Sequence, residues 1–350
     1  MPRYDVLVAG AGPVGLACAV EAALRGLSVA VVEPRTGAID KACGEGLMPG
    51  AVAGLRRLGV EPAGVPLSGI AYVDAKGVAR HAFRAGPGLG VRRTVLQSGL
   101  AARADELGVQ RIEGRVERVS QDSGGVDVDG VQASWLLACD GLHSTVRHLV
   151  GLDPTGAVSH RRYGQRRHLA AQPWSDYVEV HWGPQAEAYV TPVAPDLVGI
   201  AVLGPPGASH EGLLAGIPTL RERLAGAQWT TPARGAGPLR QRVPQRVAGR
   251  VLLVGDAAGY VDALTGEGIR TGLACAQAAV DAVMAGQPAA YERQWRRLTR
   301  SYRLLTSTLV VSSRPTVLRR HIVTAARGLP PVFGAAVEAL AGHQVHRPPR

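Results

Sequence analysis

Hydrophobic positions at the start of the chain form two short apolar runs separated by an alanine-rich stretch. Residues 4–9 are typical of a buried strand, and residues 10–15 form a glycine-rich turn. An alanine-rich helix is expected over 16–25, followed by a second buried strand over 28–32. A strand, a helix and a strand in this order indicate a parallel sheet.

Further along the chain, the hydrophobic pattern changes its period. A helix is expected over 91–107, and strands over 111–119, 126–128, 135–139 and 250–254, the last followed by a long alanine-rich helix that ends near Met284. From about residue 161, apolar and polar positions alternate, most clearly in 177–182, 187–193 and 197–203. Such alternation predicts an antiparallel sheet in a different layer from the parallel one.

Together these patterns predict an α/β fold, α+β overall, with a Rossmann-like parallel-sheet domain. That domain is expected to combine three separate segments, residues 1–66, 91–150 and 248–285. An antiparallel substrate domain is assigned to residues 67–90 and 151–247. C-terminal helices are expected over 286–342, and residues 343–350 are expected to form a frayed tail. A length of 350 residues suits two closely joined domains.

Composition excludes several other classes of protein. Hydrophobic residues make up 46% of the chain and charged residues 19%, which argues against a disordered protein. No apolar stretch reaches the roughly 20 residues that span a bilayer, and no secretory signal is recognised. The four cysteines and the histidines show no metal-ligand spacing, so no metal site is predicted. A reducing cytoplasm is the simplest compartment for such cysteines.

The net charge of +11 is concentrated near the C-terminus. Residues 291–350 contain eleven arginines and two acids. Five of the arginines follow helical spacing beside apolar residues: Arg293, Arg296, Arg297, Arg300 and Arg303. We expect a helix that packs on its own domain with the arginines in water, and peripheral contact with an anionic membrane is the alternative. No nucleic-acid motif accompanies the arginines, so no nucleic-acid partner is expected.

The glycine-rich turn Gly10-Ala11-Gly12-Pro13-Val14-Gly15 fits the dinucleotide-binding pattern G-x-G-x-x-G. The pattern requires Gly10 for a tight turn, Gly12 for close approach of a pyrophosphate, and Gly15 for helix–strand packing. The helix N-terminus that follows favours phosphate binding. Glu33 ends the second strand, where an acid is needed to bind the adenosine ribose hydroxyls. This motif alone does not separate FAD from NAD.

Two further motifs follow buried strands. The first motif is D-G-x-x-S-x-x-R, in Asp140-Gly141-Leu142-His143-Ser144-Thr145-Val146-Arg147. The second is Gly255-Asp256, which is followed by the segment Gly266-Glu267-Gly268-Ile269. With these three motifs in order, the sequence resembles the flavoproteins built like para-hydroxybenzoate hydroxylase, a group that includes the geranylgeranyl reductases. The resemblance covers residues 1 to about 340 and implies noncovalently bound FAD. Ala263 departs from a frequent form of the last segment, which has proline at this position.

The resemblance implies roles for individual residues. Asp256 is expected to bind a ribityl hydroxyl, and Asp140 with Arg147 to order the loop near the pyrophosphate. Gly266, Gly268 and Ile269 would begin a helix against the pyrimidine end of the flavin, where a helix N-terminus opposes the negative charge of reduced flavin. Further residues are assigned by position, each with a solvated surface residue as the alternative: Arg93 at the flavin, Gln97 at the ribityl chain, and Lys41 or Arg35 at the pyrophosphate.

The segment Cys43-Gly44-Glu45-Gly46 bears on the type of reaction. Geranylgeranyl reductases carry a cysteine beside the flavin ring in a similar stretch, and a subset of the hydroxylases resembles C-G-E-G-L. Cys43 is thus a catalytic thiol or a small residue under the ring. Glu45 is a carboxylate that orients a phenol or sets its protonation state, or it binds backbone amides of its own loop.

These observations leave three hypotheses for function. The first is NAD(P)H-dependent hydroxylation of an aromatic, phenolic substrate with dioxygen, the substrate lying between the antiparallel sheet and the flavin. The second is reduction of isoprenoid double bonds, and the third is flavin binding without turnover. No second glycine fingerprint follows a strand, which fits transient binding of NAD(P)H on the FAD domain. The tryptophan-rich segment of flavin halogenases is absent.

Overall fold

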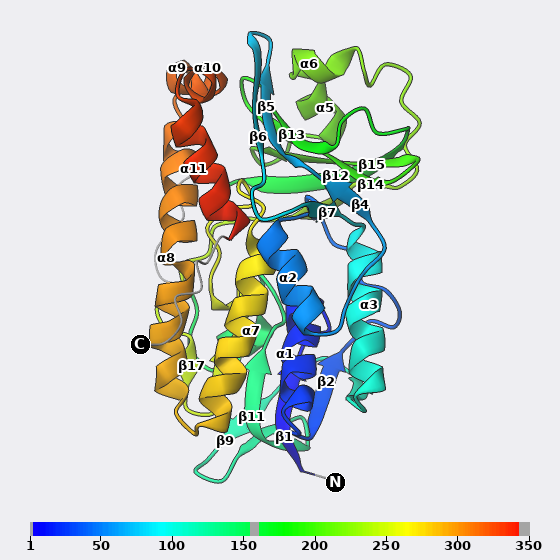
Figure 1. Cartoon of the computed structure of the whole chain (residues 1–350). Helices are drawn as coiled ribbons and strands as arrows, with labels where there is room; N and C mark the ends of the chain where they lie inside the picture. The colour runs from blue at the N-terminus through cyan, green and yellow to red at the C-terminus, as the bar shows by residue number, and fades with distance from the viewer. Residues whose placement is uncertain (1–2, 155–160, 343–350) are drawn as a thin grey trace.

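A computed structural model describes residues 3–154 and 161–342, and its two main layers are the lower and upper halves of Figure 1. The lower layer is built on a sheet with a parallel centre. Its strand order is β18 (Val251–Leu253), β11 (Val131–Ala138), β1 (Tyr4–Ala9), β2 (Val29–Glu33) and β8 (Gln110–Glu113). Three antiparallel strands extend it, β17 (Val247–Ala248), β10 (Val126–Val128) and β9 (Val119–Gln121). The predicted α/β fold is confirmed.

Helices pack closely beside this parallel sheet. Helix α1 (Pro13–Leu24) contacts α3 (Arg93–Glu106) and α7 (Gly268–Met284), and α7 contacts α8 (Pro288–Ser312). Small residues bring α1 and α7 together, because a Cβ added at Gly272 would lie 2.4 Å from Val14 Cγ2. Burial by these helices explains why the strands are continuous apolar runs rather than alternating ones.

The upper layer is a seven-stranded sheet. Its order is β16 (Arg234–Ala236), β12 (Tyr163–Ala170), β15 (Leu197–Gly204), β14 (Glu187–Ala194), β13 (Tyr177–Trp182), β5 (Gly69–Asp74) and β6 (Gly77–Ala82). All neighbouring pairs are antiparallel except β13 and β5, which run parallel. Helices α5 (His210–Ala215) and α6 (Pro218–Arg221) bury Leu213 and Leu220 against one face, in a cluster with Ile200 and Val202.

A small third sheet joins the two layers and was not predicted from the sequence. It contains β3 (Gly46–Leu47), β7 (Gly88–Gly90) and β4 (Val65–Leu67), and β3 leads into α2 (Pro49–Arg57). A Cβ added at Gly90 would lie 1.7 Å from the Pro192 carbonyl oxygen on β14. Glycine at this position therefore allows the small sheet to reach the substrate sheet.

The C-terminal helices cover both layers along one side of the molecule (Figure 1). Helix α8 buries Tyr291, Trp295 and Tyr302, and α9 (Thr316–Arg319) is followed by α10 (Ile322–Gly328) and α11 (Pro330–Ala341), which both contact β6. Four of the five helical arginines are exposed: Arg293, Arg296, Arg297 and Arg300. Arg303 is half-buried and lies over the Trp295 ring. Within the described ranges, no helix is long and apolar enough to cross a membrane. The predicted tail, 343–350, lies outside the described residues.

Several predicted elements differ from the structure in their bounds, two of them for a clear physical reason. Helix α1 begins at Pro13 rather than residue 16, since proline suits the first turn of a helix. The strand predicted over 111–119 is instead two strands, because β8 pairs with β2 whereas β9 pairs with β10. The hydrophobic pattern predicts that a strand exists but not which neighbour it pairs with.

Candidate active site

The glycine turn between β1 and α1 depends on each of its glycines for a different reason. Gly10 has a φ of 99°, and a Cβ there would lie 2.7 Å from the Cys139 carbonyl oxygen. A Cβ at Gly15 would lie 1.9 Å from the Gly10 carbonyl oxygen. Gly12 faces open space, with the Arg93 Nη2 atom 3.8 Å from its added Cβ. The turn therefore presents the N-terminus of α1 to a ligand beside Gly12.

Glu33 connects the end of β2 to this turn. Its side chain is buried, and Oε2 accepts a hydrogen bond from Ala11 N at 2.9 Å. Its Oε1 accepts one from Arg35 Nε at 2.7 Å. Glu33 and Arg35 both line a large cavity in the protein. The binding of ribose by Glu33 stays a prediction, and the carboxylate already orders the turn in this structure.

The D-G-x-x-S-x-x-R segment forms a braced loop at the end of β11. Asp140 Oδ2 accepts a hydrogen bond from Val146 N at 3.0 Å, and Ser144 caps α4 (Thr145–Leu149) by accepting one from Arg147 N. The buried Arg147 side chain donates to the Ala257 and Leu142 carbonyl oxygens at 3.2 and 3.1 Å. Arg147 thus ties this loop to the segment that contains Asp256.

Asp256 follows β18 and lies close to two cations. Burial raises the pKa of Asp256, and Lys41 and Arg93 oppose that shift. Burial likewise lowers the pKa of Lys41, and Asp256 opposes it. All three residues line the cavity. An acid and two bases from three separate segments therefore meet at one place.

The segment before α7 has Ala263 where related flavoproteins often have proline, and an acid, Asp262, holds this segment instead. Asp262 is buried, and its Oδ1 accepts hydrogen bonds from Leu264 N at 3.0 Å and from Arg162 Nη1 at 3.2 Å. Gly266 has a φ of 67°, and α7 begins at Gly268. Gly266, Gly268 and Ile269 line the cavity as a group. These bonds hold the turn in place without a proline.

Arg93 and Gln97 lie in the first turns of α3. The Arg93 side chain lines the cavity, whereas its backbone N–H donates to Glu45 Oε1 at 2.9 Å. Gln97 is buried, and its amide donates to the Ala11 carbonyl oxygen at 3.3 Å. Gln97 supports the glycine turn in this arrangement, and its contact with a ribityl chain stays a prediction.

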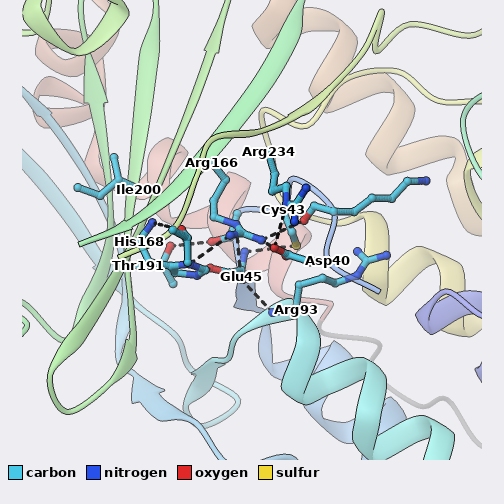
Figure 2. A network of polar contacts seen from close by, with 12 residues as sticks. Asp40, Cys43, Glu45, Arg93, Arg166, His168, Thr191, Ile200 and Arg234 are labelled. Carbon is cyan, nitrogen blue, oxygen red and sulfur yellow. Dashed lines mark hydrogen bonds and ion pairs between the residues drawn. The ribbon is translucent and has the colours of Figure 1, made fainter. Parts of the chain in front are cut away.

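The Cys43–Gly46 loop lines the cavity, and Glu45 lies close to His168 of the substrate sheet (Figure 2). Cys43 Sγ accepts a weak hydrogen bond from Glu45 N at 3.4 Å. Glu45 is buried with a φ of 60°, which non-glycine residues rarely adopt. Its carboxylate binds Arg93 N and lies 2.8 Å from His168 Nε2. Arg166 Nε also lies 3.7 Å from Glu45 Oε1. The hypothesis that Glu45 binds amides of its own loop is wrong, because all three partners come from other segments.

All of these segments line one cavity of about 1020 Å³. This volume is at the upper end of the range for small-molecule sites. Two buried polar atoms of its lining residues, Asp140 Oδ1 and Arg93 Nε, have no hydrogen-bond partner within the described part of the chain. Buried polar groups normally bind a partner, so the two atoms fit a polar ligand in the cavity. The glycine turn, the cations and these atoms suit a dinucleotide. Over the described ranges, no cluster of His, Cys, Asp or Glu could hold a metal ion.

Comparison with protein families identifies the dinucleotide that the protein binds. Residues 3–195, more than half of the chain, match the family described as FAD binding domain. The chain belongs to this FAD-binding family. The protein is therefore an FAD-dependent oxidoreductase, and FAD is its cofactor. NAD(P)H is the electron donor typical of the family.

Curated relatives of this FAD-binding protein include reductases whose similarity extends over most of the chain. It is 29% identical to menaquinone reductase from Mycolicibacterium smegmatis over 343 residues, 86% of this chain and 81% of that relative. It is 27% identical to digeranylgeranylglycerophospholipid reductase 2 from Methanopyrus kandleri, over 79% of this chain and 76% of that relative. A tetracycline-pathway monooxygenase from Streptomyces rimosus is 32% identical over only 45% of this chain and 35% of its own.

Solved structures show the same fold at low sequence identity. The p-nitrophenol 4-monooxygenase from Pseudomonas putida superimposes with a TM-score of 0.78 at 20% identity, over 98% of this chain and 99% of that one. A flavin-dependent brominase superimposes with a TM-score of 0.78 at 18% identity, over 98% and 94% of the two chains. These likenesses establish the architecture of the FAD protein.

Several polar residues near this cavity were missed by sequence reasoning. Arg166 and His168 lie on β12, Asp40 precedes the Cys43–Gly46 loop, and Thr191 lies on β14 (Figure 2). Arg166 and His168 are 0% and 1% exposed. Their spacing of two residues places them on one face of a strand, which is the only signal that the sequence carried.

Proposed function

We propose that this protein is an NAD(P)H-dependent FAD monooxygenase that hydroxylates a neutral, largely apolar aromatic substrate with dioxygen. The proposal rests on the uncharged lining of one half of the cavity. We call this half, which is lined by residues between 163 and 239, the substrate half. Between residues 163 and 239, the lining side chains include no charged group. They are Tyr163, Gly164, Gln165, Val178, Tyr189, Ala201, Leu203, Pro205, Gly207, Gly235, Ala236, Gly237 and Leu239.

The polar groups of the substrate half support a neutral substrate. Tyr189 donates its hydroxyl to the Leu264 carbonyl oxygen at 2.6 Å, and Gln165 donates its amide to the Ala208 carbonyl oxygen at 2.6 Å. Burial raises the pKa of Tyr189 and of Tyr260 well above the usual range, so both phenols stay neutral. A charged substrate would lose its hydration without gaining a partner here, which is costly.

The charged lining residues belong to the cofactor half, except Glu45, whose carboxylate lies against His168 of the substrate sheet. Lys41, Arg93 and Asp256 meet in the cofactor half, and the N-terminus of α1 faces the same space. FAD, when bound, supplies the reaction with oxygen. The chain's own part is to bind the cofactor through these groups, to hold an apolar substrate against the sheet, and to exclude water from the apolar half.

Labelled dioxygen tests this proposal directly. The FAD-loaded protein is incubated with NAD(P)H and a panel of neutral alkylphenols, and products are analysed by mass spectrometry. We expect a phenol that accelerates NAD(P)H oxidation and gains one labelled oxygen atom. If no phenol is labelled and an isoprenoid gains two hydrogen atoms without dioxygen, the hydroxylase proposal is wrong.

Reduction of an isoprenoid double bond is the second candidate, because the relatives that span most of the chain are named reductases. The apolar substrate half also suits an isoprenoid. Cys43→Ser separates the two reactions. A hydroxylase should retain most of its turnover, since its chemistry requires no thiol, whereas a reductase that uses Cys43 beside the ring should lose it. Flavin content, measured by absorbance, should stay unchanged in both cases.

We also propose peripheral contact with an anionic membrane through the C-terminal helices, which would deliver an apolar substrate. Four apolar side chains of α9 and the start of α11 are exposed: Val317, Leu318, Leu329 and Val332. Residues 293–337 contain nine arginines and no acid. Exposed apolar groups among cations are typical of protein surfaces that bind anionic lipid.

A further inference from the structure

The substrate sheet presents two adjacent rows of residues on one face, toward the FAD cavity. Residues two apart on a strand face the same side, and paired residues on neighbouring strands form a row. The first row consists of Thr191, Gly199 and His168, and the second of Tyr189, Ala201 and Arg166. Tyr189 and Ala201 line the substrate half of the cavity. The first row lies one step further along the same strands.

The first row contacts the Cys43–Gly46 loop at three points. Thr191 donates its hydroxyl to the Gly44 carbonyl oxygen at 2.8 Å, and His168 Nε2 lies 2.8 Å from Glu45 Oε2. Gly199 lies between them, and a Cβ there would come within 2.7 Å of Glu45 Oε2. Glycine at position 199 therefore leaves room for the carboxylate to reach His168.

Arg166 in the second row determines which nitrogen of His168 carries the proton. A guanidinium can only donate, and Arg166 Nη1 lies 3.1 Å from His168 Nδ1. Nδ1 is therefore the acceptor, and Nε2 carries the proton that is donated to Glu45. Arg166 also forms an ion pair with Asp40 and contacts the Lys41 carbonyl oxygen at 3.4 Å. One buried arginine thus orients His168 and holds the chain that enters the loop (Figure 2).

The loop that is held in this way needs external support. Glu45 adopts its rare φ of 60° on the loop, and such a conformation persists only when surrounding contacts stabilise it. Cys43, Gly44, Glu45 and Gly46 all line the cavity, and Glu45 also binds Arg93 N at the start of α3. The Glu45 carboxylate therefore joins the loop, a cofactor-binding helix and the substrate sheet.

We propose that His168, oriented by Arg166 and assisted by Thr191, is a positioning residue that holds the Cys43–Gly46 loop against the bound FAD. Tyr189 and Ala201 of the next row line the proposed substrate half of the cavity. The contacts of His168, which form a clamp on the loop, therefore couple the placement of a substrate there to the geometry of the loop. The proposal rests on FAD binding by the family and holds for a hydroxylase or a reductase.

Hydrogen–deuterium exchange on three variants tests the clamp, with and without FAD. In His168→Ala, exchange at the Arg93 amide and the 43–46 amides should accelerate by about tenfold or more, the scale for losing one hydrogen bond to a charged group. His168→Gln retains an N–H donor and should restore most of the protection. His181→Ala is the control: His181 is also buried in this sheet, 3.0 Å from Glu179, but it contacts Thr219 instead of the loop.

Visible circular dichroism of the bound flavin gives a second readout, since it reports the asymmetry around the ring. His168→Ala should change this spectrum, while His168→Gln and His181→Ala should keep the wild-type spectrum. Equal exchange and equal spectra for His168→Ala and His181→Ala would overturn the proposal. If His168→Ala does not fold, Thr191→Val decides: faster exchange at 43–46 supports the clamp, and unchanged exchange overturns it.

Discussion

Glu267, next to the start of α7, is a carboxylate whose side chain is 0% exposed. It forms an ion pair with Arg270, and its Oε2 atom has no hydrogen-bond partner within the described part of the chain. Burial raises the pKa of Glu267 to about 7 from an ordinary 4.5, and Arg270 opposes the shift. The folded protein therefore binds a proton at Glu267 over a pH range in which the unfolded chain does not.

A raised pKa makes the contribution of Glu267 to stability depend on pH. The contribution is fully present below pH 4.5 and is lost as the pH rises through about 7. Glu267→Gln should remove this loss and stabilise the FAD-loaded protein at pH 8 by roughly 3 kcal/mol at most. Urea unfolding at pH 5 and pH 8 measures the difference. The exposed control Glu106→Gln should keep the wild-type pH dependence, and the same slope in Glu267→Gln would contradict the prediction.

Asp256 offers a direct test of cofactor binding at a single residue. If it binds a ribityl hydroxyl, Asp256→Ala should raise the FAD dissociation constant about ten- to hundredfold, the usual scale for a hydrogen bond to a charged group. Fluorescence titration of the apo-protein measures this constant. Asp281→Ala, at a half-exposed residue paired with Arg25, is the control. An unchanged constant in Asp256→Ala would exclude the contact.

At the scale of elements, the turn before α1 must let a pyrophosphate approach the helix N-terminus. Gly12 faces open space, which a larger side chain would fill. Gly12→Val should therefore yield folded protein without FAD, measured as flavin absorbance per protein. Gly328→Val makes the same change at an exposed glycine with open space around it and should retain FAD. Stoichiometric FAD in Gly12→Val would show that the turn is not the phosphate site.

The elements around the cofactor could be predicted because their signals are local. The β1 strand, the glycine turn and α1 are adjacent in sequence, and each glycine has a stereochemical reason within that stretch. The substrate strands were likewise predicted by alternation over a few residues. Their edges and the parallel pairing of β13 with β5 were missed, because pairing depends on segments that are distant in sequence.

The clamp on the Cys43–Gly46 loop could not be predicted for the same reason. Glu45 and His168 are 123 residues apart in sequence, and each alone reads as an ordinary polar residue. Residues 163–170 contain Arg166, Arg167 and His168 in succession, which suggests a solvent-facing strand. Burial of Arg166 becomes favourable only when Asp40 and the Lys41 carbonyl oxygen are brought to it.

At the scale of the whole molecule, the basic C-terminal helices predict dependence on lipid charge. The protein should co-sediment with liposomes that contain anionic lipid and release as salt rises through the Debye screening range. Replacing the exposed Arg296, Arg297 and Arg300 by glutamine should weaken binding. Neutral liposomes are the control. Absence of lipid dependence at low salt would leave these helices as ordinary packing on the protein.

The strand order of the FAD sheet has a consequence for synthesis of the protein. Asp256, which follows strand β18, and the start of helix α7 line the cavity proposed for FAD, yet they are translated after the whole substrate sheet. Until then, Leu136–Ala138 of β11 form an open strand edge, which is prone to pairing with other chains. A nascent chain paused before residue 251 should therefore depend on chaperones, and FAD should not rescue it because its proposed site is still incomplete. The cofactor can protect this protein only near the end of its translation.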